Sequence, residues 1–290
     1  MNKVSLVLGS GGARGYAHIG AIDALEKAGY EIVSISGCSI GALVGGIYAA
    51  GNLEPFREWA LTLEPLTLLR MIDLSLLSTG GAIKGERVFE KMEPFFGDRL
   101  IEELPIRYTA VATDLDKKKE VWFQEGDLQS AIRASIAIPT IFTPLHRNGR
   151  ILVDGAVLNP LPIAPTMSDR TDLIVAVNLS ASYSSPLQPQ KPLVAQKSAF
   201  KETIEQWLSK IGISSSEKES ITQLDVLQRV IEIMQEAMTL YKIAGYTPDI
   251  LVDVPIDSCR TYDFHKAEEL IALGFELTTN AINEYQSRRS

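Results

Sequence analysis

The first 51 residues alternate twice between a short apolar segment and a helical segment, and a glycine follows each one. Lys3–Leu8 is typical of a buried strand, and Ile32–Ser36 repeats its character. Tyr16–Ala28 carries apolar residues at helical spacing and is followed by Gly29, as Ile40–Ala50 is followed by a glycine of its own. Two strands that are each followed by a helix predict an α/β fold with a central, mostly parallel sheet and helices on both faces.

The rest of the chain continues in the same manner. We expect strands at Tyr108–Thr113, Glu120–Phe123, Ile151–Val153, Leu173–Asn178 and Ile250–Val254. We expect helices at Gly85–Phe95, Asp127–Ser135, Asp225–Lys242 and Phe264–Tyr285. Residues 182–219 are rich in serine, proline, glutamine and lysine, which predicts a mobile loop with one short helix. We therefore expect a single domain over residues 1–290, with a C-terminal strand and helices over residues 221–290.

Composition excludes several classes of partner. The net charge of −8 argues against nucleic acid and against tight capture by an anionic membrane. Two cysteines, Cys38 and Cys259, do not form a disulfide framework, which favours a reducing cytoplasm. The apolar run Val4–Leu8 is too short for a signal peptide. Ile32–Leu53 carries no charge, but its glycines favour a strand, a tight turn and a packed helix over a membrane span.

The segment Gly37–Gly41 reads Gly-Cys-Ser-Ile-Gly and fits the G-x-S-x-G nucleophile elbow. In such an elbow a strand turns sharply into a helix, so the residues that flank the serine must lack a Cβ. The serine hydroxyl then projects near the positive N-terminus of the helix. A β-type segment precedes this pentapeptide and a helical one follows it, which is the context that the motif requires. Ser39 is therefore a candidate nucleophile.

The loop Gly9–Gly15 reads Gly-Ser-Gly-Gly-Ala-Arg-Gly and lies between a strand and a helix. Such a loop exposes backbone N–H groups that suit an anion, either a nucleotide phosphate or the oxyanion of an acyl intermediate. The dinucleotide fingerprint would need a glycine where Arg14 stands, and an acidic residue at the end of the second strand. That strand ends instead at Ser39, which favours an oxyanion hole.

A third element, Asp154-Gly155-Ala156, follows the apolar strand Ile151–Val153. A carboxylate at the C-terminal end of a strand lies on the side of a parallel sheet where active sites gather. The alternative interpretation is a turn aspartate without a chemical role.

These three elements, in this order, resemble the patatin-like phospholipases, in particular the bacterial branch related to neuropathy target esterase. The resemblance covers residues 4–180, including Ala134–Pro144 before the aspartate, Asp154–Pro162 around it, and Ala112–Leu115. It implies a three-layer patatin-like fold, Ser39 as nucleophile and Asp154 as base. It also implies the oxyanion hole and the residues that support the motifs: Gly11, Gly12, Ala13 and Arg14 for the hole, and Gly9, Gly37, Gly41, Gly155 and Ala156 for support.

An aspartate is a weak base for a serine hydroxyl, because its pKa is ordinarily about 4. Proton removal must therefore accompany attack, while N–H groups stabilise the charge that grows on the ester oxygen. The resemblance therefore implies a serine lipid acyl hydrolase that needs no metal or organic cofactor. Its substrate would be a phospholipid, lysophospholipid or related acyl ester.

Several residues are weighed as rivals or bystanders. We expect His18 to be a packed helix residue, and we expect His146 and His265, which opens the last helix, to be surface residues. None of the histidine spacings is that of a metal site. Cys38 is expected to point into the core, and Asp114 to belong to a solvated turn.

Two other functions stay open. One is an α/β-hydrolase esterase or thioesterase with a Ser-Asp-His triad, for which His265 is the late histidine. The other is a regulatory protein of this fold with little turnover. Leu61–Leu77 is dense enough in apolar residues for core packing, or for an acyl-chain tunnel or a lid that meets lipid. Shallow insertion of this stretch and of the amphipathic segment Phe200–Leu208 predicts weak, transient membrane association of a cytoplasmic protein. The sequence carries no signal for an oligomeric state.

Overall fold

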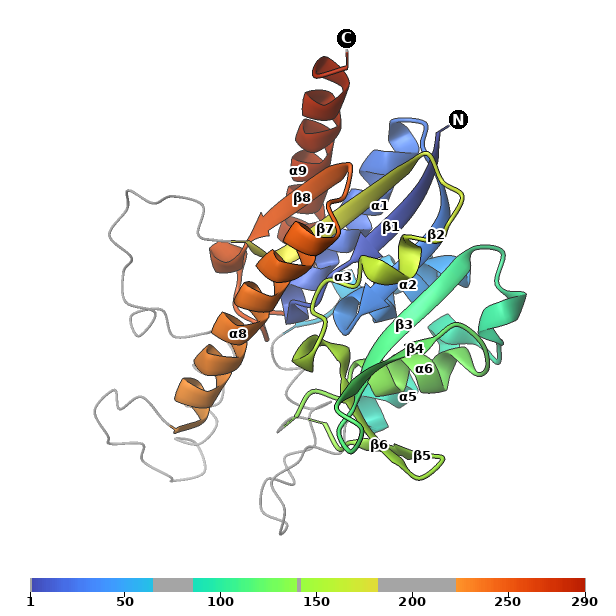
Figure 1. The fold of residues 1–290 in the computed structure, drawn as a ribbon, viewed down its shortest axis with the longest axis vertical. Coiled ribbons are helices and arrows are strands. Elements are labelled where there is room, and N and C mark those ends of the chain that lie inside the picture. Colours follow the sequence, from blue (N-terminus) through green and yellow to red (C-terminus); the bar gives the residue numbers. More distant parts are fainter. Residues whose placement is uncertain (1, 65–85, 140–141, 182–222, 290) are drawn as a thin grey trace.

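A computed structural model describes residues 2–64, 86–139, 142–181 and 223–289 of the chain (Figure 1). Its strands are β1 (Lys3–Leu8), β2 (Glu31–Cys38), β3 (Arg107–Asp114), β4 (Lys119–Phe123), β5 (Leu145–Arg147), β6 (Arg150–Asp154), β7 (Leu173–Ala181) and β8 (Ile250–Pro255). They form one eight-stranded sheet in the order β5-β6-β3-β2-β1-β7-β8, and β4 also pairs with β3. From β3 to β8 this order is parallel, whereas β4, β5 and β6 pair antiparallel.

The helices connect these strands. The α-helices are α1 (Ala17–Lys27), α2 (Ile40–Ala49), α3 (Leu53–Leu61), α5 (Glu86–Phe96), α6 (Leu128–Ser135), α8 (Gln223–Gly245) and α9 (Ala267–Ser287). Short 3₁₀ helices are η1 (Gly12–Tyr16), η2 (Ile101–Glu103), η3 (Gly155–Val157), η4 (Ala164–Thr166) and η6 (Ile256–Ser258). Among the helices within the described ranges, none combines the length and the apolar character that crossing a bilayer requires.

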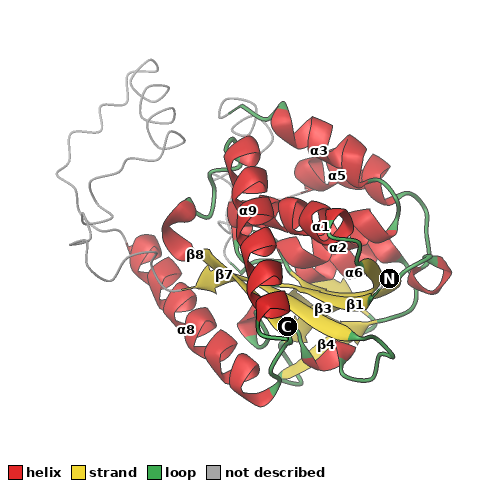
Figure 2. Ribbon diagram, turned by 90° about the horizontal axis from the view of Figure 1, so that it is seen from above, coloured by secondary structure: helices red, strands yellow, loops and turns green. Residues whose placement is uncertain are grey.

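The sheet is covered on both faces, as expected (Figure 2). Alternate residues of β1 point to opposite sides, because successive side chains in a strand alternate. Leu6 and Leu8 join the large core with α1, α2 and α9. Val7 faces the other side and packs with Leu161 and Ile163, against which Ile243 of α8 also lies. The α/β fold with helices on both faces is thus confirmed.

Most expected elements form within one to three residues of their predicted ends, and the differences are local. The helix expected from Tyr16 begins earlier, as η1, and becomes α-helical at Ala17. Apart from the short 3₁₀ helices, the elements of the described residues that were not predicted are α3 and the short strand β5. Ile32–Leu53 is β2, a tight turn and α2, as its glycines indicated. The expected loop over 182–219, the segment Phe200–Leu208 and all of Leu61–Leu77 after residue 64 lie outside the described residues.

β2 and β6 meet end to end along one edge of β3. Ala112 pairs with β4 and also with Asp154 of β6, so β4 and β6 lie on opposite edges of β3. Val111 pairs with β4 and also with Cys38 of β2, so β2 lies on the same edge as β6. Since β2 is parallel to β3 and β6 is antiparallel, their carboxyl ends approach each other. β6 is thus not one of the parallel strands, and Asp154 nevertheless lies at the edge where their carboxyl ends gather.

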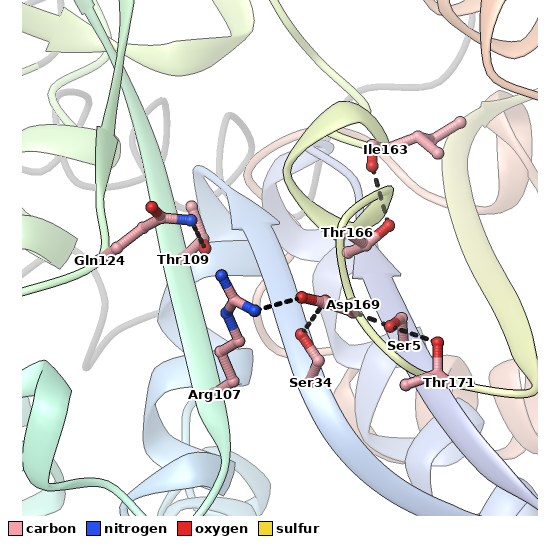
Figure 3. Close-up of polar contacts among 9 residues, drawn as sticks. All are labelled: Ser5, Ser34, Arg107, Thr109, Gln124, Ile163, Thr166, Asp169 and Thr171. Atoms are coloured by element: carbon pink, nitrogen blue, oxygen red, sulfur yellow. Dashed lines mark hydrogen bonds and ion pairs between the residues drawn. The ribbon is translucent and has the colours of Figure 1, made fainter.

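The connection between β6 and β7 is fixed to the sheet at Asp169 (Figure 3). The carboxylate Oδ2 of Asp169 accepts hydrogen bonds from Ser34 Oγ at 2.5 Å and from Ser5 Oγ at 3.3 Å. Its Oδ1 lies 2.8 Å from Arg107 Nη1. These partners belong to β2, β1 and β3 respectively, so one buried carboxylate ties the segment that begins at Asp154 to three neighbouring strands.

Candidate active site

Ser39 stands between β2 and α2 with a φ of 55° and a ψ of −124°, a conformation that L residues rarely adopt. The glycines around it are required by close backbone contacts. A Cβ at Gly37 would lie 2.5 Å from Gly41 O, and a Cβ at Gly41 would lie 2.1 Å from Leu8 O. The predicted elbow is thus present, and α2 begins directly behind the serine.

The Ser39 hydroxyl donates to Asp154 Oδ2 at 2.5 Å, and both side chains are buried. The other carboxylate oxygen, Oδ1, accepts from Ala156 N at 2.8 Å and from Cys38 Sγ at 3.8 Å. Gly155 allows this turn, because a Cβ there would lie 2.2 Å from Val111 O. The sequence placed these residues in two separate motifs, and the meeting of β2 with β6 brings them into contact.

Burial controls the acidity of this pair. It raises the pKa of Asp154 to about 6, although the hydrogen bonds from Ser39, Ala156 and Cys38 act in the opposite direction. Burial also raises the pKa of the Cys38 thiol, and the neighbouring Asp154 charge adds to that effect. Cys38 is fully buried, as predicted, and stays a thiol beside the carboxylate. A carboxylate with a raised pKa is a better proton acceptor than an ordinary aspartate.

Ser135 holds the elbow from the side of α6. Its hydroxyl accepts from Ser39 N at 2.9 Å and donates to Val111 O at 2.7 Å. Ser135 belongs to the segment that resembles the family's block before the aspartate, but the sequence gave it no role. The available signal was that Ser135 shares the apolar face of an amphipathic helix with Leu128 and Ile132, where a buried hydroxyl needs a partner.

The Gly-rich loop lies beside this pair, and its amides divide into two groups. Ser10 N donates to Pro160 O and Ala13 N donates to Thr261 O, each at 2.9 Å. The assignment of Ala13 to the oxyanion hole is therefore wrong for this conformation, because its N–H is already engaged. Gly11 and Gly12 lie at the start of η1, where a helix cannot satisfy their N–H groups. Gly12 has a φ of 58°.

Arg14 serves the frame of this loop. Its Nε donates to Leu179 O at 2.8 Å, and its Nη1 donates to Ile256 O at 3.1 Å and to Cys259 O at 3.2 Å. Burial lowers the pKa of the guanidinium, and the nearby Cys259 and Glu232 counteract it. The side chain of Arg14 therefore joins η1 to β7 and to the segment after β8, rather than presenting its charge to a substrate.

The histidines lie apart from the carboxylate. His18 Nε2 is 2.8 Å from Gly9 O, and burial lowers the pKa of this packed imidazole to about 4. His146 is exposed, as expected. His265 is half-buried and lies two residues before α9, so its assignment to the surface and to the helix start was wrong.

The prediction that Asp114 belongs to a solvated turn was also wrong. Asp114 ends β3 and is 1% exposed, and Lys117 N and Arg150 Nε approach its carboxylate from the turn and from β6.

Glu120 of β4 supports the turn after Asp154 and had no predicted role. It accepts from Lys242 Nζ at 2.8 Å, and from Trp122 Nε1 and Asn159 Nδ2 at 2.9 Å each. Burial alone would raise the pKa of Glu120, but these three donors together lower it. Asn159 is fully buried, and its backbone N–H closes the turn by donating to the carbonyl of Gly155 at 2.8 Å.

Across the described part of the chain, no three histidine, cysteine, aspartate or glutamate side chains come together in a way that could hold a metal ion.

Comparison with known proteins finds similarity over most of the chain. Residues 6–167 match the family model described as patatin-like phospholipase. An uncharacterized NTE family protein of Mycobacterium tuberculosis is 39% identical, over 98% of this chain and 92% of its own. Human patatin-like phospholipase domain-containing protein 6 is 28% identical over 95% of this chain and 20% of its own. Among solved structures, VipD of Legionella pneumophila aligns with 99% of this chain and 67% of its own, at 13% identity and a TM-score of 0.48.

Proposed function

The chain belongs to the patatin-like phospholipase family, a family of lipid hydrolases, and on that premise we propose that it cleaves acyl esters through Ser39 and Asp154. The substrate class is a phospholipid, a lysophospholipid or a related ester. The observation that carries the proposal is the 2.5 Å hydrogen bond from the Ser39 hydroxyl to Asp154 Oδ2. A direct contact of this length allows the hydroxyl proton to pass to the carboxylate without an intervening residue.

The first half of the proposed reaction forms an acyl-enzyme. Ser39 Oγ bonds to the ester carbonyl carbon while its proton moves to Asp154 Oδ2. The charge on the carbonyl oxygen is stabilised by the N–H groups of Gly11 and Gly12, and one such donor contributes about 3–4 kcal/mol. As the tetrahedral intermediate collapses, the C–O bond to the alcohol breaks, and the leaving oxygen takes the proton from Asp154.

The second half returns the enzyme to its starting state. Water attacks the acyl carbon and gives a proton to Asp154, the fatty acid departs, and Ser39 Oγ recovers the proton. The raised pKa of Asp154 suits both halves, because the residue must accept and release a proton in turn. No step in this scheme uses a metal or an organic cofactor.

The triad alternative has less support. The Ser39 hydroxyl donates directly to Asp154, which leaves no place for an imidazole between them. His18 is engaged with Gly9 O instead. A regulatory protein with little turnover remains the second candidate, since such a protein could keep the same pair. We also propose that the chain is one domain and a cytoplasmic protein that meets membranes only transiently.

The decisive experiment labels the protein with a fluorophosphonate probe and follows ester hydrolysis by mass spectrometry on a panel of lipids. Ser39→Ala should lose labelling and hydrolysis while its melting temperature stays near that of the wild type. Asp154→Asn should lose most hydrolysis, because an amide cannot accept the proton. Ser258→Ala, at a half-buried serine that donates to Pro255 O, is the matched control and should change neither readout. Hydrolysis that persists in Ser39→Ala contradicts the assignment, and a wild type that binds lipid without turnover favours the regulatory alternative.

A further inference from the structure

The helix α8 presents a continuous apolar surface to solvent. Its exposed large apolar residues, which we call the α8 apolar face, are Val226, Leu227, Val230, Ile233, Met234, Leu240 and Tyr241. At 3.6 residues per turn these seven fall within about 140° of one another. Ile233 is 65% exposed and Tyr241 is 79% exposed. Soluble proteins rarely expose a contiguous apolar patch unless it contacts something.

The attachment of α8 to the rest of the protein uses its opposite side. Thr239 is 2% exposed, and Lys242 Nζ lies 2.8 Å from Glu120 Oε1. Ile243 packs against the smaller core cluster of Val7 and Ala176. The α8 apolar face is therefore not part of the packing that holds the helix on the sheet.

Hydrogen bonds connect α8 to both loops beside Ser39. Glu232 accepts from Thr261 Oγ1 at 3.2 Å, and the carbonyl of Thr261 accepts from Ala13 of the Gly-rich loop. At the other end of the helix, Lys242 bonds to Glu120, which accepts from Asn159 in the turn after Asp154. One residue thus stands between α8 and each loop of the candidate site.

The position of α8 matches this connection. Figure 1 shows its amino-terminal half extending away from the sheet on the side to which the arrowheads of β7 and β8 point. Ser39 follows the carboxyl end of β2, which is parallel to these strands, so it lies at the same edge of the sheet. A surface in contact with the α8 apolar face would therefore lie on the side of the molecule where the substrate must enter.

We propose that the α8 apolar face docks on an uncharged lipid surface, the aggregate that carries the substrate, and this inference rests on the proposed function. No charged residue belongs to the face, and the net charge of −8 opposes an anionic surface. Shallow insertion of apolar side chains needs no charge, and a tyrosine ring such as that of Tyr241 suits the boundary between lipid and water. A second copy of the chain fits less well. The face is roughly 22 Å long and about 10 Å wide, which is far below the ~800 Å² per partner of a stable dimer.

The test is flotation of the full-length protein with phosphatidylcholine vesicles, compared between two exposed methionines. Met234 on the face is 56% exposed, and Met167 after η4 is 53% exposed. Met234→Glu should lower the vesicle-bound fraction, and Ile233→Glu with Met234→Glu should lower it roughly tenfold, because a charged group resists insertion. Met167→Glu should bind as the wild type does. Binding of the wild type should change little with salt, since no charge attraction drives it.

Three results would overturn the docking proposal. The first is a wild type that does not float with these vesicles, and the second is equal binding by the Met234→Glu and Met167→Glu variants. The third comes from light scattering: a dimeric wild type that becomes monomeric in the double variant would show that a second copy covers the face.

Ser39→Ala separates this proposal from the proposed function. It should float like the wild type but hydrolyse nothing, because Ser39 lies outside the face. The hydrolysis of vesicle lipid relative to a short, monomeric ester should fall roughly tenfold in the double variant, as binding does. A wild type that floats but hydrolyses neither ester would sink the proposed function and leave the docking surface standing.

Discussion

The two loops beside Asp154 are held in place by different parts of the chain. The elbow around Ser39 is fixed by contacts between backbone atoms: Gly37 packs against Gly41, and Gly41 packs against Leu8. The Gly-rich loop is fixed by hydrogen bonds to segments far along the chain. Its Ala13 N–H is bound by Thr261 O, which follows β8. The elbow is therefore signalled by its own glycines and contacted by β1 and α6, whereas the Gly-rich loop depends on the C-terminal part of the fold.

This difference explains which prediction failed. The glycines at both ends of Gly37–Gly41 made the elbow readable from five residues, although the contacts that Leu8 and Ser135 make with it were not. The loop Gly9–Gly15 shows only that N–H groups are available. Which of them stay available depends on the carbonyls that approach from elsewhere, and Ala13 was assigned to the oxyanion hole although Thr261 engages it.

The largest effect should come from filling the elbow. In Gly41→Ala the new Cβ would lie 2.1 Å from Leu8 O, between two central elements that cannot separate, so we expect a loss of more than about 3 kcal/mol in the free energy of unfolding and no measurable hydrolysis. Gly51→Ala is the control, because its φ is 78° and no atom lies within 4 Å of the added Cβ. It should cost about 1–2 kcal/mol, the penalty of the left-handed conformation alone. Urea denaturation measures both, and equal losses would contradict the steric account of the elbow.

The second effect should come from the anchor of the Gly-rich loop. Arg14→Met keeps the apolar stem but removes the donors for the carbonyls of Leu179, Ile256 and Cys259. We expect a loss of about 2–3 kcal/mol of stability, and a fall of about 10²-fold in kcat/KM as the loop amides shift.

The control for this prediction is Arg57→Met. Arg57 of α3 lies 2.6 Å from Asp23 of α1 and 3.1 Å from Glu54 of α3, and neither partner belongs to the Gly-rich loop. Its replacement should cost about 1 kcal/mol or less and leave kcat/KM unchanged. An Arg14→Met protein that loses stability but keeps the wild-type kcat/KM would show that the loop amides do not depend on this anchor.

The sequence predicted what local patterns encode and missed what depends on pairing between distant segments. Apolar periodicity located the five parallel strands and both long C-terminal helices. The direction of β6 was not predicted, because apolar residues alone do not reveal a strand's orientation. Asp114 was misread for a related reason: three lysines follow it closely in sequence, but β6 folds over it. Asp169 and Glu120 escaped notice because their partners come from several strands and helices.

The third effect is a dependence of kcat/KM on pH that Asp154 alone should cause. Asp154 must be ionised to accept the proton, and its pKa is raised to about 6 by burial. The value of kcat/KM should therefore fall about tenfold per pH unit below that pH. His18 on the side of the Gly-rich loop has a pKa of about 4, so His18→Gln should leave this limb in place. If the acid limb of kcat/KM shifts in His18→Gln, the titrating group is His18 and not Asp154, and the prediction is wrong.

The smallest effect is expected in the pH dependence of stability, where the contributions of His18 and Asp154 have opposite signs. Burial keeps His18 neutral, so its pKa falls from 6.5 to about 4, and the stability of the fold is lost as pH falls through this window. Burial favours the protonated form of Asp154, so its pKa rises from 3.8 to about 6, and stability is lost as pH rises through that window. Between about pH 4.5 and 5.5 each contributes a slope of about 1.4 kcal/mol per pH unit, with opposite signs.

Removing either group should therefore expose the slope of the other. Asp154→Asn should gain stability with rising pH relative to the wild type, because only the His18 contribution remains. His18→Gln, whose amide can still donate to Gly9 O, should lose stability with rising pH, because only Asp154 remains. Urea midpoints measured at several pH values in this window follow all three proteins, and the groups common to them cancel in the comparison. Equal pH slopes in the wild type and in both variants would mean that neither buried group titrates differently in the folded and unfolded states, and the contrast between the two loops would then rest on packing and hydrogen bonds alone.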